Sequence, residues 1–354
     1  MAHNTVKMCS IGQRKIGVFL SGGLDSSLIA HELNKLMPPA LTFTNKMNPN
    51  VVTEEDFNSD ASAAKKLAEI EKYNHTEVEI TPKNMIEAWN DSIYFMEQPM
   101  YNQSVSMYCY TNKVLHDHNV VVTMAGDMGD EILGGYPKYW KMRNKEFFGK
   151  HLDKGKIESW KDVITLWMAR IKRPLLLADI GANIDKQIIQ EEMLKLYPDD
   201  LWNPEDPINS CMALDCVTQV PEEFFNRNDK FGMAYGMEGR FPLATKMFMQ
   251  YCMDIHSDEK IGLWKDNTKG LTKKAYKNLL PKQIINKSKT GWTVPMGDWM
   301  TKNESAELNN LYKASLGEKS GLDIIKTSQK AGKALLPAWI INDWMKVYKI
   351  KNEN

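Results

Sequence analysis

A short glycine turn near the start of the chain is the first segment whose residue types could do chemistry. The stretch "GVFLSGGLDSSLIAHEL" runs from an apolar segment through Ser21, Gly22 and Gly23 into a helical pattern that contains Asp25. Two glycines remove the Cβ atoms that would block a ligand, and the N–H groups at the start of the following helix form a partly positive concave site. The turn therefore favours an anion, and phosphate is the natural one.

The spelling of this turn separates it from the common phosphate loops. Neither Gly-x-x-x-x-Gly-Lys-Ser/Thr nor Gly-x-Gly-x-x-Gly occurs in the sequence. A carboxylate beside a phosphate is repulsive unless a divalent cation lies between them, so Asp25 implies Mg²⁺. The alternative is a plain glycine turn in which Asp25 only caps the helix.

A second candidate segment is "AGDMGDEILGGY", residues 125–136, which directly follows the apolar run "VVVTM". It carries carboxylates at Asp127 and Asp130. Carboxylates of this kind can hold a hard cation or act as a general base. Asp127 can equally be a cap for a helix that starts near Asp130.

The elements that must position these turns alternate between strands and helices. Strands are expected at residues 15–20, 40–44, 75–80 and 120–124, and helical patterns at 26–37, 61–70 and 85–96. This alternation predicts an α/β fold with right-handed crossovers and a parallel sheet that has helices on both faces. Ligands bind such sheets at the carboxyl ends of the strands, where the glycine turn falls.

The second half of the chain has a different texture. Beyond Tyr139 the patterns are longer and mostly helical, and they end in an expected docked helix at residues 334–348. The organisation predicted is an N-terminal extension at 1–14, an α/β core at 15–140, and a mostly helical part at 141–354 that completes the site.

Composition excludes several classes of protein. The chain has 354 residues, 43% of them hydrophobic, and its 45 Lys and Arg balance its 45 Asp and Glu. A neutral chain has no overall attraction to nucleic acid or to a membrane, so nucleic acid is an unlikely partner. Five cysteines without a Cys-x-x-Cys pair, and the lack of a signal peptide or long apolar run, predict reduced thiols in a cytoplasmic protein.

The turn "SGGLDSS" resembles the pyrophosphate-binding loop of the ATP pyrophosphatases, which split ATP between its α- and β-phosphates. That resemblance implies an adenine nucleotide alpha hydrolase-like fold, also called the PP-loop fold. It implies ATP as the nucleotide.

Within that group the chain resembles the synthetase domain of the asparagine synthetases. "AGDMGDEILGGY" is similar to their pattern Ser-Gly-Glu-Gly-Ser-Asp-Glu-apolar-apolar-Gly-Gly-Tyr. Three further stretches match in the same order: "NRNDKFGMAYGMEGRFPL", "NKSKTGWTVPMGDWM" and "ALLPAWIINDWM". Two departures from this pattern matter. Ala125 replaces the serine, and Asp127 replaces the glutamate to which the family's catalysis is attributed.

The resemblance implies roles for individual residues. Contacts with ATP and pyrophosphate are implied for Phe19, Leu20, Ser21, Gly22, Gly23, Asp25, Ser26, Ala125, Gly126, Asp130 and Lys289. Asp25 and Asp130 are the expected Mg²⁺ ligands. Lys289 is expected to neutralise charge on the α-phosphate, unless it is a solvated loop lysine, and Asp127 is the expected general base.

The predicted reaction is adenylation of a carboxylate, with aspartate as the first candidate, followed by release of pyrophosphate and transfer of ammonia to give asparagine and AMP. The chain is expected to be a free-standing synthetase domain without the family's N-terminal glutaminase domain, so ammonia is expected to come from solution or from a separate glutaminase. Self-association of the chain is left open.

Two alternatives remain at this point. Asp127, and Ala244 where many relatives have Asp after Pro-Phe-Leu, favour a different carboxylate or an internal amine, as in lactam formation or peptide cyclisation. The same changes allow an ATP-binding module without catalysis, and a tRNA-modifying relative is a further possibility. His116 and His118 are read as residues of a polar turn rather than as metal ligands.

Overall fold

The computed structural model describes residues 1–48, 58–100, 102, 104–152, 157–168, 186–264, 267–288, 294 and 340–350. The chain divides into two compact units. The sheet unit consists of residues 11–125, 225–240 and 290–354, and the helical unit consists of residues 1–10, 126–224 and 241–289.

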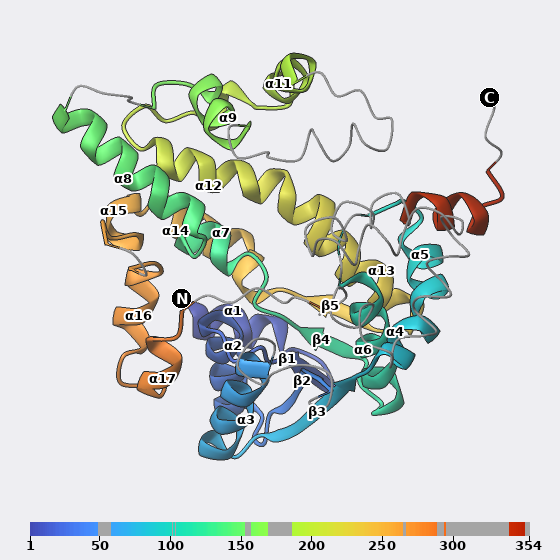
Figure 1. The fold of residues 1–354 in the computed structure, drawn as a ribbon. Helices are drawn as coiled ribbons and strands as arrows, with labels where there is room; N and C mark the ends of the chain where they lie inside the picture. Colours follow the sequence, from blue (N-terminus) through green and yellow to red (C-terminus); the bar gives the residue numbers. More distant parts are fainter. Residues whose placement is uncertain are drawn as a thin grey trace. The chain divides into compact units, whose positions relative to one another are not determined.

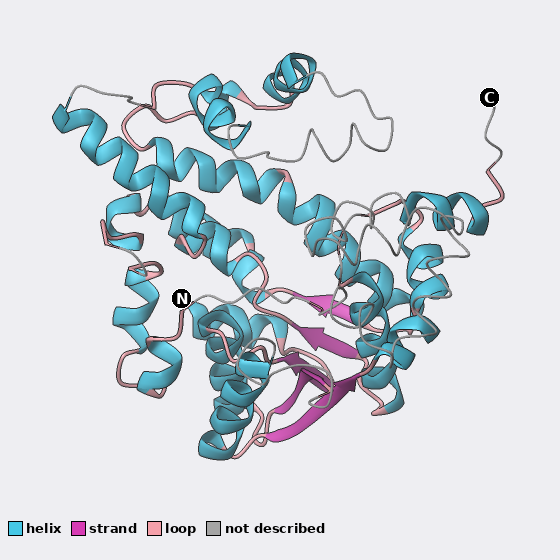
Figure 2. Ribbon diagram, viewed as in Figure 1, coloured by secondary structure: helices cyan, strands magenta, loops and turns pink. Residues whose placement is uncertain are grey.

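The sheet unit is built on five parallel strands (Figure 2). In chain order they are β1 (Ile16–Phe19), β2 (Leu41–Met47), β3 (Asn74–Ile80), β4 (Val122–Met124) and β5 (Glu238–Arg240). Their order across the sheet is β3-β2-β1-β4-β5, and Gly17 of β1 pairs with Leu41 on one side and with Thr123 on the other. The predicted α/β fold with a parallel sheet is confirmed.

The strand order explains which helices cover each face of the sheet. The helices α2 (Leu24–Leu36) and α3 (Ser59–Glu71) lead outward from β1 to β3. The chain then returns past β1 to β4 through α4 (Pro82–Glu87), α5 (Trp89–Met96) and α6 (Val105–Asp117). Because right-handed crossovers in opposite directions place their helices on opposite faces, these two groups sandwich the sheet (Figure 1).

Helices on both faces account for the apolar character of the central strands. All four residues of β1 and all three of β4 are buried, without the alternation of a half-exposed strand. Val18 and Phe43 are completely buried at the centre of this core. The strand order reverses between β1 and β4, which is where a parallel sheet opens a crevice at its carboxyl edge.

Three local predictions need correction. The single helical pattern at 85–96 is two helices, α4 and α5, which meet at Ala88. The strand β5 was missed, because it has three residues with Gly239 at its centre and its pairing with β4, not its own propensity, defines it. His116 belongs to the last turn of α6, so only His118, the C-cap of that helix, lies in the predicted turn before β4.

The helical unit confirms the predicted helical texture over its described residues. Its helices are α1 (Ala2–Cys9), α7 (Gly129–Leu133), α8 (Pro137–Leu152), α9 (Trp160–Met168), α11 (Lys186–Lys195), α12 (Pro207–Val217), α14 (Lys246–Met253), α15 (Ser257–Lys260), α16 (Gly270–Tyr276) and α17 (Lys282–Ile285). A core of buried side chains joins α8, α9 and α12 through Tyr139, Val163 and Leu214. The N-terminal helix α1 packs against the short turn Pro242–Ala244.

The predicted terminal helix is present at residues 340–347 and docks on the sheet unit. Trp344 donates its indole N–H to the Glu97 carbonyl at 3.0 Å, and Trp89 donates to Asp343 at 2.9 Å. Tyr348 stacks on Tyr94. The helix therefore docks on α5 and the residue that follows it, while residues 334–339 of the prediction lie outside the described residues.

The five cysteines are free thiols, and all except Cys9 are buried. Burial raises the pKa of the Cys109 thiol to about 12 and that of Cys252 to about 11. Thiols of this kind pack as small apolar side chains. None of the described helices has the length and apolar character that a membrane span requires.

A lysine is completely buried at the end of α15. Lys260 has no exposed surface, and its Nζ donates a hydrogen bond to Asn209 Oδ1 at 2.8 Å. Burial lowers the pKa of this ammonium group to about 8, and nearby acidic groups such as Cys252 and Asp206 oppose the shift. The folded protein therefore releases a proton that the unfolded chain keeps until a higher pH.

This buried ammonium group predicts a pH-dependent stability. Between a folded pKa near 8 and an unfolded pKa near 10.5, the unfolded state binds more protons, so stability rises with pH. We expect the free energy of unfolding of the wild type to increase by about 2 kcal/mol between pH 7 and 9.5, relative to Lys260→Met. Urea titrations at the two pH values measure this difference.

The matched control is Lys282→Met, which removes an exposed lysine of α17. It should leave the pH slope of the wild type unchanged. Parallel pH curves for the wild type and Lys260→Met would contradict the assignment of a buried, charged lysine.

Candidate active site

The glycine turn predicted to bind phosphate directly follows β1 and starts α2. Ser21 and Ser26 lock it, because the Ser21 N–H donates to Ser26 Oγ at 3.1 Å and the two hydroxyls are 3.0 Å apart. Ser26 Oγ also donates to the Gly23 carbonyl at 3.2 Å. Gly23 is the N-cap of α2 and no side chain caps this end, so the turn presents the positive end of a 13-residue helix.

Gly22 is required by the close approach of α3. Its φ is +68°, a conformation that side chains disfavour, and a Cβ there would lie 2.6 Å from the Asp60 carbonyl oxygen and 2.7 Å from the Ala64 nitrogen. Ala61 and Ala64 are small and buried, which allows α3 to come this near. The turn is therefore shaped by packing as well as by its own sequence.

The sheet places other predicted residues at the same edge as this turn. Val18 pairs with Met124, so Phe19 and Leu20 after it and Ala125 after β4 all lie at the carboxyl end of adjacent strands. The Leu20 N–H donates to the Phe43 carbonyl at 2.8 Å, and Ala125 is almost fully buried. Asp25 lies in the first turn of α2, where a carboxylate is stabilised by the helix dipole.

The segment after Ala125 belongs to the helical unit and forms a tight turn. The Gly129 N–H donates to the Gly126 carbonyl at 3.2 Å, and Asp127, which is half-buried, lies inside that turn. The N-cap of α7 is Met128, so Asp127 lies one residue before the N-cap position of that helix.

Met128 is a departure from the family pattern that the sequence reasoning missed. Its φ is +76°, and it stands where the quoted pattern has its second glycine. Glycine adopts this conformation freely, whereas a methionine is strained in it. The glycine in the pattern was the signal that could have identified the position.

The carboxylates of α7 are deeply buried, and each contacts a polar or charged side chain. Glu131 is 1% exposed and accepts a hydrogen bond from the Tyr136 hydroxyl at 2.6 Å. Burial, together with the charge of Asp130, raises the pKa of Glu131 to about 7. Asp130 pairs with Lys269, whose Nζ lies 2.5 Å from Asp130 Oδ1. Neither Glu131 nor Lys269 was among the predicted site residues.

A second layer of polar contacts supports Tyr136. Lys138 Nζ lies 5.3 Å from the centre of the Tyr136 ring and 5.2 Å from that of Tyr139. Lys138 also pairs with Asp215 of α12, and the Tyr139 hydroxyl donates to the same carboxylate. The turn after α7 is thereby tied to the core of the helical unit.

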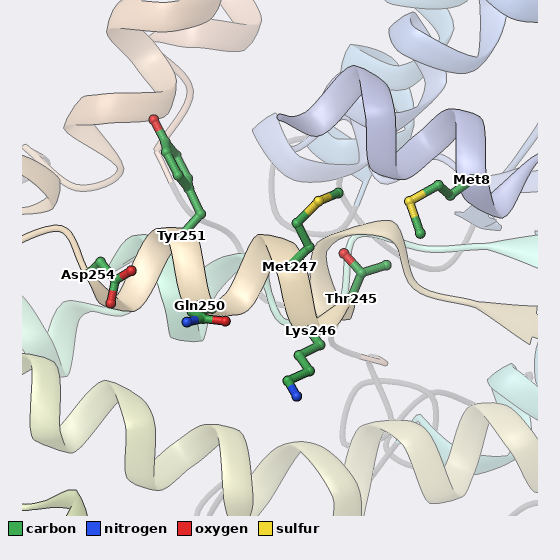
Figure 3. Close-up of a pocket in the computed structure, with 7 residues that line it drawn as sticks. All are labelled: Met8, Thr245, Lys246, Met247, Gln250, Tyr251 and Asp254. Atoms are coloured by element: carbon green, nitrogen blue, oxygen red, sulfur yellow. The ribbon is translucent and has the colours of Figure 1, made fainter.

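The remaining predicted features are placed as follows. Lys289 lies outside the described residues. Among the described residues, no group of three or more His, Cys, Asp or Glu side chains could hold a metal ion. An open groove of about 550 Å³ lies elsewhere in the helical unit, between Met8 of α1 and α14 side chains that include Met247 and Tyr251 (Figure 3). None of the predicted site residues that the structure describes lines this groove.

Comparison with known proteins assigns the chain to one family. The Asparagine synthase family model matches residues 3–330. Asparagine synthetase [glutamine-hydrolyzing] 1 of Bacillus subtilis is 24% identical over 319 residues, which cover 82% of this chain and 48% of that protein. A putative asparagine synthetase [glutamine-hydrolyzing] of Mycobacterium tuberculosis is 22% identical over 316 residues, 82% of this chain and 47% of that protein.

A shorter match reaches a human protein. Asparagine synthetase [glutamine-hydrolyzing] of Homo sapiens is 31% identical over 147 residues, which cover 41% of this chain and 26% of the human protein. This chain thus spans about half the length, or less, of the curated relatives that it matches.

The packing of Gly22 predicts how the turn responds to a single methyl group. Gly22→Ala adds a Cβ to a positive-φ residue and drives it into the backbone of α3, so we expect a loss of about 3 kcal/mol in the free energy of unfolding. Urea-induced unfolding measures this loss.

Gly236→Ala is the matched control in the same unit. Gly236 has nearly the same φ, +67°, but no atom of the described residues lies within 4 Å of its Cβ position. Backbone strain alone should remove about 1 kcal/mol there. Equal losses for the two variants would show that contact with α3 does not constrain the turn.

Proposed function

Because this chain belongs to the asparagine synthase family, we propose that it is an ATP-dependent ligase that adenylates a carboxylate, releases pyrophosphate and transfers ammonia to the acyl group. Aspartate is the proposed carboxylate, and asparagine and AMP are the proposed products. Family membership implies the ATP-dependent ligase type, while the carboxylate and the ammonia source are parts of the proposal. A separate glutaminase is a candidate source of ammonia.

The observation that carries the proposal is the serine-locked turn between β1 and α2. It lies where the strand order reverses, it ends in an uncapped helix N-terminus, and Gly22 leaves no Cβ in the way. Such a turn binds an anion through backbone N–H groups. We assign it to the β- and γ-phosphates of ATP, which leave together as pyrophosphate.

The carboxylates fit a metal ion that they share with the nucleotide. Mg²⁺ usually takes one or two protein carboxylates and completes its shell with substrate phosphates and water, so a dedicated cluster of three ligands is not needed. Asp25, whose Oδ1 is buried, and Asp130, also buried, offer the hard oxygen atoms that this ion prefers. When bound, the ion neutralises the phosphate oxygens.

Two other residues of the chain are assigned to charge neutralisation and to proton transfer. Neutralisation of the negative charge on the α-phosphate is assigned to Lys289. Ammonia loses a proton after it attacks the acyl carbon, and Asp127, half-buried in the turn before α7, is the proposed base. Asp127 is one methylene shorter than the glutamate of the family pattern, which favours a carboxylate other than aspartate, or an internal amine, as the second candidate.

The test is a product assay. Purified protein with MgATP, aspartate and ammonium is expected to form AMP, pyrophosphate and asparagine in equal amounts, measured by chromatography and mass spectrometry. ATP–pyrophosphate exchange with a panel of carboxylates identifies the acyl donor. ADP formation, or no exchange with any carboxylate, would rule out the proposal.

A pair of variants tests the metal role of Asp25. Asp25→Asn removes the charge but keeps the size of the side chain, and we expect at least a hundredfold loss in the exchange rate, because a Mg²⁺ ligand is lost. Asp91→Asn is the control, since Asp91 lies in the first turn of α5 and is exposed. An unchanged rate for Asp25→Asn would overturn the assignment.

A further inference from the structure

A buried ion pair in the helical unit joins α7 to α16. The side chains of Asp130 and Lys269 are only 11% and 9% exposed, and the carboxylate oxygen Oδ1 lies 2.5 Å from the ammonium nitrogen. The two residues are far apart in the sequence, and no motif connects them. Water screens the charges of such a buried pair poorly, so each charge strongly influences the other.

The surrounding backbone is shaped to hold this pair. Gly135, which follows α7, has no room for a Cβ, because one there would overlap both the Asp130 carboxylate and the Lys269 side chain. The Gly135 N–H donates to the Asp130 carbonyl at 2.8 Å, which fixes the chain around the carboxylate. Any side chain at position 135 would therefore displace the pair.

Lys269 itself is held in a strained conformation. It is the N-cap of α16 and has a φ of +54°, which is uncommon for a residue with a side chain. Strain of this kind persists only where the surroundings determine it. The lysine is thus directed at Asp130 by the fold and is not a surface residue that happens to find a partner.

We propose that Lys269 is a positioning residue that acts as the built-in counter-cation of Asp130, and that Mg²⁺ competes with its ammonium group for the carboxylate. The inference rests on the proposed function, in which Asp130 is a Mg²⁺ ligand. Before a metal binds, Lys269 neutralises and orients the buried carboxylate.

Competition follows from distances and charge. Mg²⁺ binds carboxylate oxygens at about 2.0–2.1 Å and requires their lone pairs. An ammonium group 2.5 Å from Oδ1 already occupies that position, and a second cation there would be repelled by it. Metal binding therefore opens the ion pair, and loss of Lys269 makes Asp130 more available to the metal.

The experiment measures the melting temperature of the nucleotide-free protein with and without MgCl₂ at constant ionic strength. The variants are Lys269→Met and Lys269→Gln, the second of which keeps a hydrogen-bond donor for Asp130. We expect saturating Mg²⁺ to raise the melting temperature of both variants by about 2 °C. The wild type should respond less, because its lysine competes.

Two controls locate the effect. The double variant Asp130→Asn/Lys269→Met should lose the response to Mg²⁺. Lys274→Met removes an exposed lysine of α16 that pairs with Glu259 at 3.6 Å, and it should respond as the wild type does. Equal responses of the wild type and both Lys269 variants, or a response that persists in the double variant, would overturn the inference.

Folding failures also decide the question. If both single variants unfold and the double variant folds, the two charges depend on each other and the counter-cation role is supported; if the double variant unfolds as well, the role is rejected. None of these measurements uses ATP or a carboxylate. A protein that forms no pyrophosphate would therefore refute the proposed function without changing these results.

Discussion

The reversal of strand order between β1 and β4 is the constraint on which the rest of the sheet unit depends. Parallel pairing on both sides of β1 puts the carboxyl ends of β1 and β4 at one edge of the sheet. Ser21 and Ala125 therefore share that edge, although roughly a hundred residues separate them in the sequence. The central strands can pair in this way only because helices cover both faces and the strands are buried along their whole length. The candidate site is thus a consequence of topology before any side chain acts.

The helical unit depends on a different constraint: its buried carboxylates need partners that form ion pairs or hydrogen bonds with them. Leaving one buried charge without its partner typically costs about 3–5 kcal/mol. Asp130 has Lys269, Glu131 has Tyr136, and Asp215 has Lys138 and Tyr139. These partners come from α7, α8, α12, α16 and the turn after α7, so the polar contacts also connect the helices around α7.

Local patterns predicted the sheet core well, because strands and helices there repeat with clear periods and the glycine turn has a recognisable spelling. They failed where long-range contacts decide. β5 exists through its pairing with β4, and Lys269 is recognisable only once Asp130 lies beside it. Gly22 was predicted for its effect on a ligand, yet the backbone of α3 is what constrains it. The roles of Asp25, Asp127 and Lys289 stay predictions.

Met128 shows how the turn next to Asp127 tolerates a departure from the family pattern. A left-handed conformation costs a residue with a side chain about 1–2 kcal/mol, whereas full burial of a methionine contributes about 1.5–3 kcal/mol. Met128 is 2% exposed, so its burial offsets the backbone strain. The positive φ of +76° is the conformation that glycine favours, which explains glycine in the pattern. The turn can therefore accept methionine at position 128 and keep that backbone, so the missing hydroxyl of Ala125 and the shorter side chain of Asp127 are chemical changes that remain in this segment.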